Sequence, residues 1–256
     1  MAVQEIDELK IYRGQDYYIN DKIIIRSPTL GEICDYGDNA YFSMIRTITS
    51  TPTDMMWQLD DIGLDFTKID NFTLFSQIVC GKTEEMTEDK FQLNKERTSI
   101  ILGDLNLFDF DLHTDENGEI VMYNKKTDTL IDGYTYRLIS EAIRKMHFLK
   151  ENIAKPANES TRLVLIEDAR DEYLINKNKT PSSYLLNLIS TMINCPGFKY
   201  NHSEVWNMKI NAFLDSVKRI AKIQNAELLL QSGYSGFGIN LKEIPNKQLD
   251  WLGDLD

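Results

Sequence analysis

Hydrophobic positions recur at helical spacing through most of the second half of the chain. In 134–149, apolar side chains stand three or four residues apart, and this spacing predicts an amphipathic helix with one buried face. The predicted face contains Tyr134, Leu138, Ile139, Ile143, Met146 and Leu149. Two further helices are expected, over 160–175 and 182–193, and Pro196-Gly197 ends the second.

The longest predicted helix follows, over 203–233. Ser203 is expected to cap it, and Glu204 favours its positive end. Gly233 is expected to end it. Its predicted buried stripe consists of Trp206, Ile210, Phe213, Leu214, Val217, Ile220 and Ile223. The pattern of 131–256 therefore predicts a helical bundle.

Shorter periods mark two candidate hairpins in the first half of the chain. One covers 9–26, with a first strand at Leu9–Arg13 and a turn at Asn20-Asp21. The other covers 107–123, around Asn117-Gly118. Asn-Gly between alternating apolar residues is a strong signal for a two-residue hairpin turn.

Short helices are expected between these hairpins. Ser27-Pro28 and Thr51-Pro52 each predict a helix start, because proline fits the first turn and the preceding hydroxyl can cap it. Asp70 predicts a cap for a helix over 72–79. The polar stretch 81–98 is expected to be an exposed loop or a short surface helix.

Taken together, these patterns predict an α+β protein that is predominantly helical. Its first part, 1–130, is an acidic mixed region with one or two β-hairpins. Its second part, 131–256, is a helical bundle with an amphipathic C-terminal tail. The boundary is placed at 125–133, where the character of the chain changes.

Composition supports a globular protein with a full core. The chain has 256 residues, 42% of them hydrophobic, with 11 Phe, 12 Tyr and 3 Trp. Its apolar runs are far shorter than the roughly 20 residues that span a bilayer. The acidic start of the chain is unlike a signal peptide, so the cytoplasm of a cell is the expected location. The 3 cysteines are far apart, which argues against a disulfide framework and a zinc site.

The net negative charge of the chain comes entirely from its first half. Residues 1–130 hold 12 Lys and Arg against 25 Asp and Glu, whereas 131–256 hold 16 against 15. A surface of that sign repels phosphate backbones, so binding to nucleic acid is not expected. It is either a solvated acidic surface or a docking face for a basic partner.

No cluster of residues points to catalysis. The 3 histidines, His113, His147 and His202, have no second His or Cys at metal-ligand spacing. The carboxylates Asp60, Asp61 and Asp65, with Asp109 and Asp111, are of the type used in acid–base chemistry, but spacing alone does not bring them together. We therefore expect a protein that is not an enzyme, with no catalytic residue, cofactor or metal.

The C-terminal segment is the one candidate binding site. It is short, acidic and amphipathic, with a tryptophan as anchor. The candidate partner-binding residues are Leu249, Trp251, Leu252 and Leu255. Segments of this type dock into grooves on a partner, or they fold back over their own protein, and both alternatives are open.

The chain resembles structural and assembly proteins of tailed bacteriophages of Gram-positive hosts. The residues that carry the resemblance are Ser27-Pro28-Thr29-Leu30-Gly31-Glu32-Ile33, Tyr41-Phe42, Thr51-Pro52, Asp54-Met55 and Trp251-Leu252-Gly253. Within that group it is most similar to tail assembly chaperones, which bind the tape-measure protein. The resemblance implies a non-enzymatic morphogenesis protein that binds a long helical tail protein. It does not account for the two hairpins.

Two other functions stay open. The chain could be a structural virion component of the head, neck or tail, which would place it in the virion. It could also be an acidic inhibitor that mimics nucleic acid and blocks a host defence protein. The inhibitor hypothesis requires the carboxylates of 1–130 to line one face. An oligomer is compatible with each of these functions.

Overall fold

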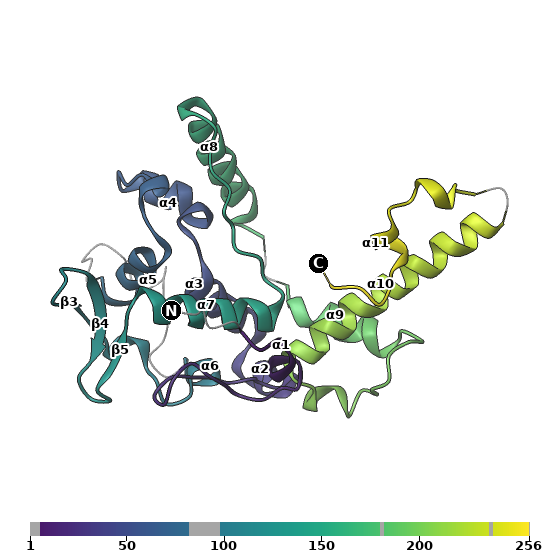
Figure 1. Cartoon of the computed structure of the whole chain (residues 1–256), viewed down its shortest axis with the longest axis horizontal. Helices are drawn as coiled ribbons and strands as arrows, with labels where there is room; N and C mark the ends of the chain where they lie inside the picture. The colour runs from purple at the N-terminus through teal and green to yellow at the C-terminus, as the bar shows by residue number, and fades with distance from the viewer. Residues whose placement is uncertain (1–5, 82–97, 180–181, 236–237, 256) are drawn as a thin grey trace.

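The structure, a computed structural model, describes residues 6–81, 98–179, 182–235 and 238–255. A body of short helices and two small antiparallel sheets carries two projecting helices, α8 (Glu159–Asn176) and α10 (Ile210–Tyr234) (Figure 1). The fold is α+β and mainly helical, as the sequence predicted. The prediction for 81–98 falls almost wholly outside the described residues.

The body is formed by elements from both halves of the chain. Its first elements are α1 (Glu8–Tyr12), β1 (Tyr17–Tyr18), β2 (Ile24–Ile25), α2 (Leu30–Tyr36), α3 (Asp38–Thr49), η1 (Pro52–Met55), α4 (Met56–Asp61), η2 (Phe66–Lys68), α5 (Asn71–Cys80), α6 (Ser99–Leu102) and η3 (Leu107–Asp109). They are followed by β3 (Asp111–Thr114), β4 (Ile120–Asn124), β5 (Thr129–Ile131), α7 (Gly133–His147), α9 (Tyr184–Ile193) and η4 (Val205–Asn207), and after α10 come η5 (Leu241–Glu243) and α11 (Asn246–Leu249).

The first sheet is a short hairpin in which β1 pairs with β2, Tyr17 opposite Ile25. The prediction of a strand at Leu9–Arg13 is wrong, because this stretch forms α1. The carboxylate of Asp7 accepts a hydrogen bond from the backbone N–H of Lys10. A side-chain cap of this kind stabilises a helical turn against the strand propensity of the apolar residues that follow.

The second sheet confirms the hairpin around Asn117-Gly118. Strands β3 and β4 are antiparallel, with His113 opposite Val121, and Gly118 has a φ of +83° in the turn. The carboxylate of Asp115 accepts hydrogen bonds from the N–H groups of Asn117 and Glu119. A third strand, β5, pairs with β4. The sequence analysis did not predict it, because three residues are too few to show the alternation of apolar and polar positions typical of a strand.

One predicted helix start differs in detail from the structure, and another is confirmed. The cap of α2 is Thr29 instead of Ser27, and Thr29 and Glu32 form a reciprocal capping box. Ser27 is buried, and its N–H donates to the carboxylate of Asp16. The predicted cap at Asp70 is confirmed, because its carboxylate accepts from two N–H groups of α5.

Helix α7 lies at the centre of the hydrophobic core. It packs against α1, α3, α5, β2, β5 and α10. Leu138, Ile139, Ile143 and Met146 are buried, as their spacing predicted, whereas Tyr134 at the start of the predicted face is 48% exposed. Leu149 lies beyond the end of the helix. The same core contains side chains from both halves of the chain, so they share hydrophobic contacts, and the division near 130 stays a prediction.

Helix α10 begins and ends later than predicted. Ser203 does not cap it: residues 202–204 form a turn, residues 205–207 form η4, and the first residue of α10 is Ile210. Gly233 does not end it either. A Cβ atom on Gly233 would lie 2.2 Å from Cγ of Leu241, so this glycine lets the returning chain lie close to the helix.

Candidate protein-binding surface

The C-terminal tail, residues 238–255, folds back along α10 (Figure 1). Leu249 and Leu255 are half-buried. Trp251 is 47% exposed and Leu252 is 74% exposed. The four predicted residues are therefore in one segment, but two are partly covered and two remain available to a partner. Their role in binding a partner stays a prediction.

Two basic side chains of α10 hold the end of the tail. Nη1 of Arg219 donates to the backbone oxygens of Trp251, at 2.7 Å, and Gly253, at 2.8 Å. Nζ of Lys222 donates to the backbone oxygen of Asp254, at 2.6 Å. We call these two side chains the clamp. Since a charged donor strengthens a hydrogen bond, the clamp fixes the course of the backbone without using the tryptophan side chain.

A cavity of about 530 Å³ lies beside the end of the tail, between α1, the end of α7 and the base of α10. Its lining mixes apolar and charged groups. Its lining includes Ile11, Arg144, Phe148, Asp215, Lys218 and Leu255. Arg144 is buried, and its Nη2 donates to the backbone oxygen of Thr49. Burial raises the pKa of the Asp215 carboxyl, which the nearby Arg219 opposes.

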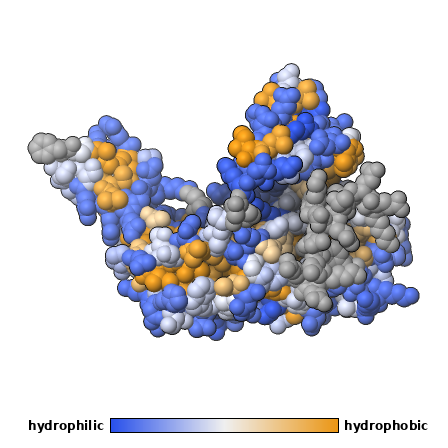
Figure 2. Space-filling model, turned by 180° about the vertical axis from the view of Figure 1, so that it is seen from behind, coloured by the Kyte–Doolittle hydropathy of each residue, from blue (hydrophilic) through white to orange (hydrophobic). Residues whose placement is uncertain are grey.

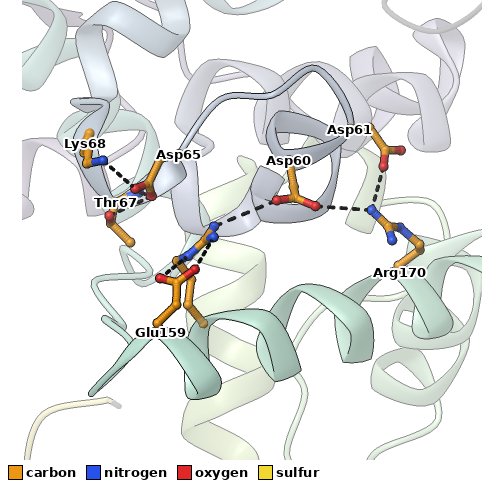
Figure 3. Close-up of polar contacts among 8 residues, drawn as sticks. Asp60, Asp61, Asp65, Thr67, Lys68, Glu159 and Arg170 are labelled. Carbon is orange, nitrogen blue, oxygen red and sulfur yellow. Dashed lines mark hydrogen bonds and ion pairs between the residues drawn. The ribbon is translucent and has the colours of Figure 1, made fainter.

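The second projecting element, α8, is attached to α4 by ion pairs. Asp60 lies 3.8 Å from Nη1 of Arg162 and 3.5 Å from Nη2 of Arg170. Asp61 pairs with the same Arg170 at 2.6 Å (Figure 3). A small apolar cluster lies under these pairs, and Ile166 is the one residue of α8 that is buried in it.

The outer side of α8 carries exposed apolar side chains. They are Leu163 (49% exposed), Val164 (53%), Leu174 (53%) and Ile175 (69%). Figure 2 shows apolar patches on both projecting parts of the molecule. Large apolar side chains gathered on projecting elements are typical of surfaces that bind another protein. The sequence predicted a helix over 160–175 but did not predict that these side chains are exposed.

Four of the five carboxylates considered for acid–base chemistry, Asp60, Asp61, Asp65 and Asp109, have structural partners. Asp65 accepts from the hydroxyl and N–H of Thr67 and pairs with Lys68, and these contacts lower its pKa to about 2 (Figure 3). Asp109 pairs with Lys126 at 3.0 Å. These partners give the four carboxylates a structural role.

His147 is buried in the core. Its Nδ1 lies 2.7 Å from the backbone oxygen of Ile143, so this nitrogen carries the proton, and its Nε2 accepts the hydroxyl of Tyr41 at 2.7 Å. Burial lowers the pKa of His147 to about 4. Across the described residues, no group of three or more His, Cys, Asp or Glu is placed to hold a metal ion.

A second cavity, of about 390 Å³, was not predicted. It lies between α9 and the turns before α10, and Leu185, Ile189 and Trp206 contribute to its apolar lining. Trp206 was assigned to the buried stripe of the last helix, and it lies instead in η4 at this cavity. Within the described ranges, no helix is long and apolar enough to cross a membrane.

Comparison with known proteins gives no relative: no family model, curated protein sequence or solved structure matches the chain.

Proposed function

We propose that the chain is a non-enzymatic protein-binding factor of phage morphogenesis, acting as a tail assembly chaperone for a long helical tail protein. The observation that carries the binding part of this proposal is the exposure of large apolar side chains on helix α8 and on the tail that lies along α10. Trp251 and Leu252 on the tail, and Val164 and Ile175 on α8, stand in water in the single chain. Covering them with a partner would be favourable.

The phage part of the proposal is supported by the resemblance of 24–59 and of the Trp251-Leu252-Gly253 ending. We call the two projecting parts, α8 and α10 with its tail, the arms. A helical partner suits them, since a helix can present apolar residues three and four positions apart to each arm. Tryptophan is enriched among the residues that contribute most to binding, so Trp251 is the expected anchor on this chain.

Affinity purification from infected cells tests this function. The tagged chain is purified during infection, and both the eluate and the finished particles are analysed by mass spectrometry. Enrichment of a long tail protein in the eluate, with the chain absent from particles, is the result we expect. Presence in particles at a fixed copy number would make the chain a virion component instead. A host protein alone in the eluate would favour the inhibitor.

The acidic half of the chain gives the inhibitor less support than its charge suggests. Many of its carboxylates accept hydrogen bonds inside their own caps and turns, as Glu32, Asp54, Asp70 and Asp115 do. A mimic of nucleic acid needs carboxylates in a row on one face, directed at the partner. Aspartates at helix starts occur in any orientation relative to such a face.

A further inference from the structure

The tail is held to α10 without a buried side chain. Among residues 238–255, none is buried. On α10 itself, the only buried residue beyond Leu214 is Ala226. A segment with little buried apolar surface opens at low cost in free energy, so the tail is among the parts of the chain that separate most easily.

Space remains on both sides of the end of the tail. Asp254 and Leu255 line the cavity of about 530 Å³ at the base of α10. The same two residues line another cavity, of about 490 Å³, between α10 and the part of the tail near Pro245. Both cavities are open to solvent, so neighbouring side chains do not enclose the end of the tail.

The contacts that do fix the tail are directed at its backbone. The clamp residues Arg219 and Lys222 donate to the carbonyl oxygens of Trp251, Gly253 and Asp254. This geometry requires three backbone carbonyl oxygens in this place, and the tail supplies them. It does not require that the segment belong to the same chain as the clamp.

We propose that the tail of one copy binds the clamp of a second copy, so that two chains associate by exchanging tails. The partner is a second copy because its tail is the one segment that the structure shows to fit the clamp. Exchange of an identical element is a known low-cost route to dimers. The exchange needs no phage partner, although Trp251 and Leu252 are used in both proposals.

Exposed apolar side chains favour the exchanged form. Exchange brings two α10 arms together, and Leu228 (65% exposed), Trp251 (47%) and Leu252 (74%) can then be covered. This gain opposes the advantage of the chain's own tail, whose high effective concentration favours the closed single chain. Association therefore increases with protein concentration, or when the chain's own tail is released.

A complementary pair of full-length variants tests the exchange. In the first, Arg219→Gln with Lys222→Gln removes the clamp and leaves the tail intact. In the second, Asp254→Lys with Leu255→Lys damages the tail, because lysines are placed beside Lys218 and Lys222, and leaves the clamp intact. All four positions lie outside the core, and circular dichroism confirms the folding of each variant. A matched control, Lys125→Gln with Lys199→Gln, removes two exposed cations elsewhere.

The readout is the mass in solution, by light scattering and analytical ultracentrifugation. Each variant alone stays monomeric, and the equimolar mixture forms a one-to-one dimer with affinity about tenfold or more above that of either variant alone. When the control replaces the clamp variant in the mixture, association is weaker, because its tail stays on its own clamp. A mixture no more associated than its separate parts would overturn the proposal, and so would equal association with the control.

Discussion

Helices α7 and α8 have similar lengths but opposite relations to the core. Of the 15 residues of α7, nine are buried, whereas α8 has 18 residues and buries only Ile166. The apolar residues of α7 recur every three or four positions. In α8 the four apolar residues Leu163–Ile166 are consecutive, so their side chains point in different directions around the helix and do not share one face. Spacing, more than apolar content, decides which helix becomes core and which keeps its apolar side chains exposed.

The largest effect is expected where the core is deepest. Phe75 is 1% exposed, and its ring stacks on that of Tyr136 at 4.4 Å between centroids. Phe75→Ala should lower the free energy of unfolding by about 3–5 kcal/mol, because it leaves a cavity. In contrast, Leu228→Ala on the α10 arm, where the side chain is 65% exposed, should change it by about 0.5 kcal/mol or less. Denaturant unfolding measures both, and equal losses would contradict the distinction between core and arm.

The core should also be the part that responds to acid. The pKa of His147 is about 4 in the folded chain, against 6.5 for an ordinary histidine. Between these values the unfolded chain binds a proton that the folded chain excludes. His147 therefore gives full stability above pH 6.5 and loses about 3 kcal/mol as the pH falls towards 4.

The substitution His147→Gln isolates this effect. The variant should be less stable at pH 7, but the difference in unfolding free energy from the unsubstituted chain should shrink as the pH falls from 6.5 to 4. Denaturant unfolding at several pH values measures this difference. If the difference does not change with pH, His147 is not the group that titrates.

A smaller and local effect is expected at the attachment of α8. Asp60 pairs with both Arg162 and Arg170, and all three side chains are partly exposed. Asp60→Asn should therefore cost about 0.5–1 kcal/mol. Hydrogen exchange should become about two- to fivefold faster in α8 and stay unchanged in α7. A matching increase in α7 would show that the two helices unfold as one unit.

The smallest change in overall stability is expected at Gly233. A Cβ atom there would lie 2.2 Å from Cγ of Leu241, so in Gly233→Ala the segment around Leu241 must move. Alanine favours the helix by about 1 kcal/mol, which offsets part of the cost. We expect a shift in unfolding free energy of about 0.5 kcal/mol or less, with faster proteolysis of 238–255. Unchanged proteolysis would mean that Leu241 adjusts without release of the tail.

Much of the local structure could be predicted from the sequence, because its causes are local. The cap at Asp70, the turn at Asn117-Gly118 and the buried face of α7 each depend on residues a few positions apart. The errors at Leu9–Arg13 and Ser27 arose where two local signals compete. Strand propensity competed with the cap of Asp7, and Ser27 with Thr29.

The candidate surface could be predicted only in part, because it depends on contacts between distant residues. The sequence singled out Trp251 and Leu252, but not that Arg219 and Lys222 hold the backbone beside them. It also did not show that α8 stands away from the body. The position of α8 depends on its attachment to α4 by pairs such as Asp61 with Arg170, which are 109 positions apart in the sequence.

The central claim is that the exposed apolar residues of the arms hold a long tail protein. The most direct measurement is the yield of soluble tape-measure protein on co-expression with the chain, with the double variant Trp251→Ser and Leu252→Ser, and with a control, Ile62→Ser, at a body residue that is 62% exposed. The account predicts a high yield with the chain and the control, and a large loss with the double variant. A yield that is the same with and without the chain would contradict the claim.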